Sequence, residues 1–338
     1  MSNIQTEIKK QQELFNRFGE ISVTGWAKSP LIQYDRDDAK AFRFKIKERD
    51  SYFISNDEVG LNISVADFGI HATISATLVD FKEGKIHSKT MSKIILLNKI
   101  SMPSSTEAGD VTYTDIRAGI NFAKSARKRY IKCDFSNFFD GKNLYANIML
   151  EQSIEDRMVT VIPFSENRSM FFYKQFLPQM RASGTIRCGG DEYYLNLQET
   201  TALLDWTRCS LPPKTCYHTM FAQGNIGGSP FAINLANNIG DTSNGTENCF
   251  FFHDHVHKLA NIKITSQKGD ITKPWRFTAG LSVLDITFMP MIKSGRLMTA
   301  DTDKRTLVYG HISGSINQSG MSHIMIDAMP AFMEMAVL

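Results

Sequence analysis

The feature that most constrains the fold is a repeated pattern of short apolar segments separated by turn residues. These segments are rich in Ile, Val, Phe, Tyr and Thr, and Gly, Asn, Asp or Lys divide one from the next. Such a pattern is typical of antiparallel strands joined by short turns. Strands that alternate with long amphipathic helices, which a parallel α/β sheet requires, are absent. The sequence therefore predicts an all-β protein.

The predicted strands are spread along most of the chain. They are residues 61–66, 72–81, 85–89, 113–122, 130–135, 144–150, 184–188, 193–197, 231–235, 247–253, 257–265, 284–290, 307–316 and 322–326. In residues 42–46, apolar and basic side chains alternate, as in a strand with one buried face. Helices are predicted only at residues 7–18, which have an apolar side and stop at Gly19, and at residues 330–337.

The length of the chain sets the number of domains. An antiparallel barrel of about eight strands needs roughly 130 to 170 residues, and this chain has 338. Two consecutive barrel-like domains are therefore predicted, at residues 1–169 and 170–338, preceded by the short N-terminal helix. No clear internal sequence repeat accompanies them, so this prediction depends on counting strands.

Net charge and cysteine content indicate which classes of partner and which cellular compartment to expect. The 38 basic and 35 acidic residues give a net charge of +3, too small to favour a nucleic-acid partner. No segment is apolar enough to be a transmembrane span, and the charged N-terminus is unlike a signal peptide. Five scattered cysteines without a Cys-x-x-Cys pair indicate free thiols in the reducing cytoplasm. Whether the protein forms a homo-oligomer stays open.

Eight segments, in a fixed order, carry a family resemblance. They are Gly25–Leu31, Ile46–Asp50, Ala66–Gly69, Met102–Ser105, Leu204–Arg208, Gly240–Ser243, Thr246–Asn248 and Pro274–Thr278. Together they resemble the bacterial family catalogued as domain of unknown function 2804, although Arg49 stands where that family usually has Trp. The family is in turn similar to carotenoid 1,2-hydratases and related lipocalin-like proteins. This resemblance implies two lipocalin-like barrels and an apolar ligand or substrate.

Two carboxylates are the candidate catalytic groups. Asp205 lies next to Trp206 and three residues before Arg208. One interpretation is a structural pair of Asp205 with Arg208 across a domain junction, with Trp206 beneath. The other is a pocket acid whose pKa burial raises. Glu247 begins a predicted strand and could point into the second barrel, although most glutamates at strand starts are exposed.

The candidate ligand-binding residues are mainly aromatic. Trp26, Trp206, Trp275 and the neighbouring Phe277 could line an apolar pocket or plug a barrel end. Arg208, His257 and His311 are the polar candidates. His253, His255 and His257 alternate and could ligate a metal, but a polar hairpin end is the favoured interpretation, so no metal site is predicted.

Missing motifs argue against cofactor chemistry. The chain has no Gly-x-Ser-x-Gly, no Walker loop, no His-Glu-x-x-His and no dinucleotide fingerprint after a strand. No cofactor is therefore predicted.

Two functions remain. The first is a lipocalin-like binder that holds an elongated hydrophobic small molecule, a lipid or isoprenoid, in one barrel or between the two. The 23 Phe and 16 Met residues suit an irregular apolar ligand. The alternative is a cofactor-free hydratase, isomerase or cyclase acting on an unsaturated lipid or isoprenoid, with Asp205 or Glu247 as its acid. A wholly apolar cavity would favour binding, and a buried carboxylate facing an aromatic wall would favour catalysis.

Overall fold

The computed structural model consists almost entirely of antiparallel strands. It describes residues 5–41, 43–94, 100–152, 154–237, 239–280, 283–302, 305–318 and 320–337. Within these ranges the helical elements are two short 3₁₀ turns, η1 (Arg36–Asp38) and η2 (Arg43–Lys45). No helix of the described residues is long and apolar enough to cross a membrane.

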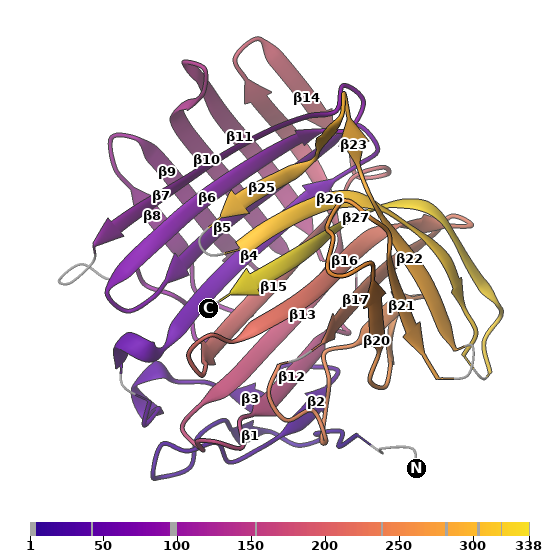
Figure 1. Cartoon of the computed structure of the whole chain (residues 1–338). Coiled ribbons are helices and arrows are strands. Elements are labelled where there is room, and N and C mark those ends of the chain that lie inside the picture. Colours follow the sequence, from indigo (N-terminus) through magenta and orange to yellow (C-terminus); the bar gives the residue numbers. More distant parts are fainter. Residues whose placement is uncertain are drawn as a thin grey trace.

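The first large sheet takes up the N-terminal part of the chain (Figure 1). Its strands are β2 (Gly25–Ala27), β4 (Lys47–Ser55), β5 (Val59–Asp67), β6 (His71–Asp80), β7 (Lys85–Ile94), β8 (Val111–Thr114), β9 (Ala118–Ser125), β10 (Lys128–Phe139), β11 (Lys142–Glu151), β12 (Met158–Pro163), β13 (Phe171–Cys188), β14 (Asp191–Leu195) and β15 (Thr201–Ser210). Their spatial order is β7-β6-β5-β4-β15-β13-β11-β10-β9-β8, while β12 and β14 also pair with β13, and β2 pairs with β12.

The second large sheet is formed by the rest of the chain. Its strands are β16 (Cys216–Ile226), β17 (Ser229–Asn237), β18 (Cys249–Phe252), β19 (His255–Lys258), β20 (Lys263–Ser266), β21 (Trp275–Ala279), β22 (Leu284–Pro290), β25 (Thr299–Thr302), β26 (Arg305–Ile316) and β27 (Ile324–Val337). Their order is β19-β18-β17-β16-β27-β26-β22-β21-β20, and β25 pairs with β26. Two small sheets pair β1 (Gln12–Glu13) with β3 (Ile32–Gln33), and β23 (Ile292–Lys293) with β24 (Arg296–Leu297).

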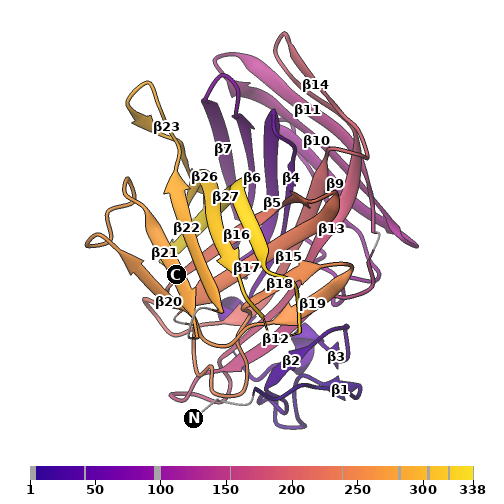
Figure 2. The same ribbon diagram turned by 90° about the vertical axis from the view of Figure 1, so that its right-hand side faces the viewer.

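Both large sheets are assembled in the same way. In the first, β4–β7 form one meander, β8–β11 and β13 form another, and β15 pairs with both. In the second, β16–β19 form one group and β20–β22, β25 and β26 form the other, and β27 joins them. The last strand of each half therefore closes its sheet from the middle. Figure 2 shows both sheets strongly curved.

A pair of glycines occupies matching places in the two sheets. Gly184 on β13 has φ of +140°, and Gly314 on β26 has φ of +145°. A Cβ atom would lie 2.9 Å from the Cα of Ile148 at the first position and 2.9 Å from the Cα of Ile286 at the second, and closer still to a carbonyl oxygen. These φ values and this crowding require glycine. The two sheets therefore share a local backbone device as well as a strand order.

Each sheet buries its interior face, and the strands at the contact between the sheets, such as β4, β5 and β15, are buried on both faces. The interior face of the first sheet carries one core cluster, which includes Ile63, Ile148 and Trp206. The interior face of the second carries another, which includes Phe277 and Ile312. A third cluster packs the sheets against each other, and we call this contact region the junction; its members include Phe53, Leu203, Phe176, Phe221, Tyr309 and Phe332.

The prediction of an all-β protein with two lipocalin-like barrels is confirmed: the chain forms two curled, antiparallel half-barrel sheets. The predicted N-terminal helix is wrong. Backbone N–H groups of Ile8 and Leu14 donate to Trp26 and Gln33, at 2.7 and 2.8 Å, in place of helical partners. Pairing with later segments prevails because a short isolated helix is only marginally stable.

Two further local predictions are wrong. Residues 330–337 lie in β27, where β16 and β26 pair with them on both sides. Residues 43–45 form η2 and β4 begins only at Lys47, while Phe42 lies outside the described residues. The change from one large sheet to the other lies between Ser210 and Cys216. The division into domains at residues 169 and 170 stays a prediction.

Candidate functional site at the junction

Strand β15 distributes its side chains to two different environments. Alternation places Asp205 and Thr207 on the junction face, and Trp206 and Arg208 on the interior face of the first sheet. An odd spacing of three residues puts Asp205 and Arg208 on opposite faces. The structural pair of Asp205 with Arg208 considered from sequence therefore does not form.

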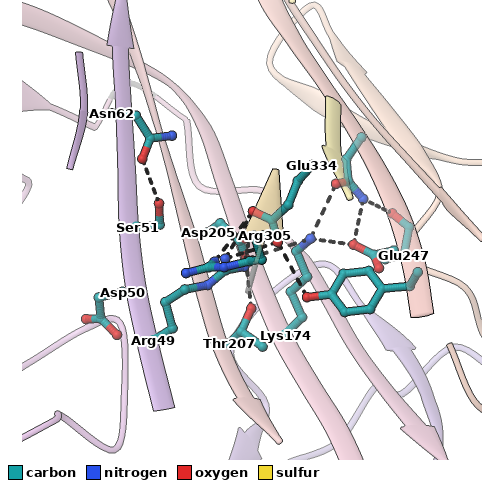
Figure 3. Close-up of polar contacts among 12 residues, drawn as sticks. Arg49, Asp50, Ser51, Asn62, Lys174, Asp205, Thr207, Glu247, Arg305 and Glu334 are labelled. Carbon is teal, nitrogen blue, oxygen red and sulfur yellow. Dashed lines mark hydrogen bonds and ion pairs between the residues drawn. The ribbon is translucent and has the colours of Figure 1, made fainter. Parts of the chain in front are cut away.

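A network of six buried charged side chains crosses the junction (Figure 3). We call it the junction network; it consists of Arg49, Lys174 and Asp205 from the first sheet, and Glu247, Arg305 and Glu334 from the second half. Three cations meet three anions, so the network has no net formal charge. It contains both residues proposed as catalytic.

Arg49 and Lys174 connect the anions. Arg49 Nη1 donates to both carboxylate oxygens of Glu334, at 3.1 and 3.0 Å, and its Nη2 donates to Asp205 Oδ2 at 2.8 Å. Lys174 Nζ bonds Oε2 of Glu247 and lies 3.7 Å from Asp205 Oδ1. Arg305 Nη1 lies 3.5 Å from Glu334 Oε2. The network thus joins β4, β13 and β15 to the second half of the chain.

Burial and pairing oppose each other in this network. Burial alone would lower the pKa of Arg49, but Glu334 and Asp205 raise it. Burial would likewise lower the pKa of Lys174, and Asp205 and Glu247 raise it. Both cations therefore stay charged beside their carboxylate partners. Asp205 also accepts from Thr207 Oγ1 at 2.9 Å, so both of its oxygens are engaged.

A cavity of about 220 Å³ adjoins the network, and we call it the junction cavity. It is lined by Ile162, Ala236, Asn237, Ile239, Thr242, Thr246, Glu247, Asn248, Asn261 and Ile262. Asn261 is exposed and Thr242 half-buried, so the mouth lies on their side. Glu247 is buried, and its Oε1 has no hydrogen-bond partner among the described groups.

A second charged network lies inside the first sheet, away from the junction cavity. Arg208 Nη1 donates to Asp50 Oδ1 at 2.8 Å, and its guanidinium carbon lies 3.8 Å from the centre of the Trp206 ring. Tyr34 donates to Glu48 at 2.9 Å, and burial raises the pKa of Asp50 despite Arg208. Trp206 and Arg208 are thus fully buried in a paired network of the core.

The other predicted ligand-binding residues lie in three separate places. Trp26, on β2, belongs to the apolar cluster of the junction. Trp275 and Phe277 are in the core of the second sheet, where Trp275 Nε1 donates to the Asp270 carbonyl at 3.2 Å. His257 stacks on the Phe250 ring with centroids 4.7 Å apart, and burial lowers its pKa.

His311 lines a different, shallow cavity of about 380 Å³ together with Asp57 and Asp327. Of the nine residues selected from sequence, Asp205 and Glu247 share the junction network, Trp206 and Arg208 share the network inside the first sheet, and only Glu247 lines the junction cavity. Their catalytic and ligand-binding roles stay predictions. Within the described ranges, no group of three His, Cys, Asp or Glu side chains could hold a metal ion.

Sequence reasoning missed Arg49 and Lys174, which pair with Asp205 and Glu247, and Glu334, which pairs with Arg49. A usable signal was present, because Lys174 and Glu334 are isolated charges in strongly apolar stretches, 171–177 and 331–336. A lone charge in a buried strand requires a partner. The sequence does not reveal which partner, since the three residues are far apart along the chain.

Comparison with known proteins adds a family and a fold. The model of a family described as a domain of unknown function (DUF2804) matches residues 5–337. Among solved structures, kievitone hydratase from Nectria haematococca is 12% identical with a TM-score of 0.56, covering 86% of this chain and 88% of its own. A protein from Nitrosomonas europaea provisionally designated AttH is 12% identical with a TM-score of 0.52, covering 86% and 92%. No curated protein matches. At this identity the likeness shows the fold alone.

Proposed function

The chain belongs to the family described as a domain of unknown function (DUF2804), and from this premise we propose that it binds a small, mainly hydrophobic molecule, a lipid or isoprenoid, in the junction cavity. The observation that carries the proposal is the lining: Ile162 from β12 and Ala236, Ile239 and Ile262 from the second half form its apolar part, and six polar residues, one of them the buried Glu247, form the rest. Ligand pockets are typically apolar walls with a few polar groups that fix orientation.

The size of the cavity limits the ligand. At about 220 Å³ it lies below the roughly 300 to 1,000 Å³ of pockets for drug-sized molecules. A ten-carbon isoprenoid suits this space, and a longer chain would extend out through the mouth beside Thr242 and Asn261. The interiors of the two sheets offer less room, because side chains such as Phe231 and Phe277 are fully buried there.

The test is to find a ligand and then to block the cavity. Native mass spectrometry and solvent extraction of protein purified without detergent should recover a hydrophobic molecule. Thr242→Trp, at the mouth, should weaken binding of the isoprenoid alcohol geraniol at least about tenfold by filling the entrance. Ser243→Trp is the matched control, since Ser243 is exposed and does not line the cavity. Equal binding by wild type and Thr242→Trp would contradict the proposed location.

A cofactor-free hydratase or isomerase is the second candidate. Glu247 favours it, because this buried carboxylate lines the junction cavity and Asp205 lies in the same network, and water addition needs one group to protonate a carbon and another to accept a proton from water. The likeness to kievitone hydratase is consistent with it. The described lining contains no aromatic side chain that would steady a carbocation, so binding is the better supported function. Unchanged turnover in Glu247→Gln and Asp205→Asn would exclude this mechanism.

A further inference from the structure

Three basic side chains of the first half of the chain act on the carboxylate of Glu107, in the segment between β7 and β8. Arg157 Nη1 forms an ion pair with Glu107 Oε1, and the charges of Lys124 and Arg129 attract the same carboxylate. We call Lys124, Arg129 and Arg157 the basic cluster. They come from β9, β10 and the residue before β12, and none of them lines the junction cavity.

The two arginines of the basic cluster are held in place by neutral groups. Arg129 is 4% exposed, and it donates to the Thr106 carbonyl at 2.7 Å and to the Tyr52 hydroxyl at 3.4 Å. Arg157 Nη1 donates to Thr106 Oγ1 at 2.8 Å. The Nε atoms of both arginines are buried without a hydrogen-bond partner among the described groups. Buried cations with such surroundings are stabilised by an anion beside them.

Glu107 is the anion at this place, and solvent reaches it. Its side chain is 45% exposed, whereas that of Arg157 is 4% exposed. Burial raises the pKa of Glu107, but the hydrogen bond and charge of Arg157, followed by the charges of Lys124 and Arg129, lower it below its ordinary value. Residues 108–110, which follow, are exposed as well. Glu107 can therefore turn into water without disturbing apolar packing, and an ion pair with an exposed partner is weak enough to be replaced.

We propose that the basic cluster is a binding site for the carboxylate of a small organic acid, and that the Glu107 carboxylate occupies this site as a tethered competitor. An incoming carboxylate takes the place of Glu107 Oε1 on Arg157, and no covalent bond changes. Guanidinium groups suit this ligand because their N–H donors match the two oxygens of a carboxylate. The site is separate from the junction cavity, so the inference goes beyond the proposed function and does not depend on it.

The charge of the basic cluster indicates which acid binds best. Once Glu107 has turned away, three positive charges remain. Asp50 also attracts Arg129, but it is already bonded to Arg208. A dicarboxylate should therefore bind more tightly than a monocarboxylate, because it brings a second negative charge to the cluster. Glutarate and butyrate are a suitable pair of probes.

The first experiment removes the competitor. At pH 7.5, where glutarate is a dianion, calorimetric titration at low ionic strength should give a dissociation constant at least about tenfold lower for Glu107→Gln than for wild type, because a site that is occupied internally binds with reduced apparent affinity. Glu155→Gln is the matched control, since it removes an exposed carboxylate that pairs with Arg127, and it should bind as wild type does. Equal binding of glutarate by the two variants, or no binding by either, overturns the inference.

The second experiment removes the cations in the Glu107→Gln background. Arg157→Met should raise the dissociation constant for glutarate at least about tenfold, and the half-buried Lys124→Gln at least about threefold. Should Arg157→Met prevent folding, Lys124→Gln decides alone, and an unchanged affinity overturns the inference. Tighter binding of butyrate or of inorganic phosphate than of glutarate overturns the assigned ligand class. None of these variants alters the lining of the junction cavity, so geraniol binding reports on the proposed function separately.

Discussion

The two large sheets share a strand order and differ in what their interiors contain. The interior of the first sheet includes buried, paired charges such as Asp50 and Arg208 beside apolar side chains. In the second half, the buried charged residues Glu247, Arg305 and Glu334 instead belong to the junction network. The interior of the second sheet is an apolar cluster of Phe, Ile, Met and similar residues. Strand order is therefore compatible with very different interior chemistry.

This difference shows that the features shared by the two sheets determine the fold, whereas the chemistry of the interiors can vary within it. Alternation, turns and the glycines at 184 and 314 are common to both halves. Buried ion pairs contribute little net stability compared with apolar packing, but removing one partner is strongly destabilising. The first interior should consequently be more sensitive to a single lost charge than the second is to a single lost methyl group.

The largest expected effect is on the first interior. Arg208→Met leaves the carboxylate of Asp50 buried without its arginine, and should lower the free energy of unfolding by about 4 kcal/mol in urea denaturation. The double variant Arg208→Met with Asp50→Leu should recover at least half of that loss, because it removes the unpaired charge. If Arg208→Met lowered the free energy of unfolding by less than about 1 kcal/mol, the first interior would not be more sensitive to a lost charge than the second is to a lost methyl group.

The next effect tests the likeness of the two sheets. Gly184→Ala and Gly314→Ala should each cost about 3 kcal/mol or more, since both positions combine a glycine-only φ with a carbonyl oxygen close to the new Cβ. The two losses should agree within about 1 kcal/mol. Gly190→Ala, where nothing lies within 4 Å of the added atom, is the control and should have little effect. Unequal costs at 184 and 314 would mean that the two positions are not equivalent.

A smaller effect compares apolar packing. Phe277→Leu in the second interior and Phe135→Leu in the first remove similar contacts from fully buried rings. Each should lower the free energy of unfolding by about 1 to 2 kcal/mol, by loss of buried area and a small cavity. Thermal or urea unfolding of the two variants measures it. If the two variants lose similar free energies of unfolding, the two interiors differ in their buried charges and not in their apolar packing.

The smallest effect concerns His218, a titratable group at the apolar second interior. It lies 5.3 Å from Trp275 between ring centroids, and burial lowers its pKa. The unfolded chain then binds the proton more readily, so the stability contributed by neutral His218 is full above its ordinary pKa and is lost on acidification. Between pH 7.5 and 5.5, wild type should lose up to about 1 kcal/mol more than His218→Phe. An identical pH dependence would contradict this.

The sequence predicted the fold well where the pattern is local and regular. Alternation identified β10 and β11 because each has one face in a core, and short apolar, β-branched runs between turn residues identified β5, β6 and β26. It failed at residues 7–18, where an apolar side resembles a helix although the backbone pairs with segments far along the chain. The strand order could not be predicted either, since β15 also pairs with β4 and β27 also pairs with β16, strands that lie far before them in the chain.

The candidate site was predictable only in part. Asp205 and Glu247 were selected for their residue type and neighbours, and both belong to the junction network. Their partners Arg49 and Lys174, and Glu334 beyond Arg49, come from strands whose contact depends on how the sheets pack. Local sequence does not encode that packing, so the site could be suspected but not assembled.

The central position of β15 and β27 has a consequence for biosynthesis. As the chain leaves the ribosome, the groups β4–β7 and β8–β13 emerge before the strand that unites them, so β4 and β13 each expose an unpaired edge until residue 210 is free. Open edges invite wrong partners. The second sheet likewise has unpaired edges on β16 and β26 until β27 has been synthesised. A nascent chain of this protein thus passes twice through a vulnerable stage, and chaperones that shield strand edges would act at those two points.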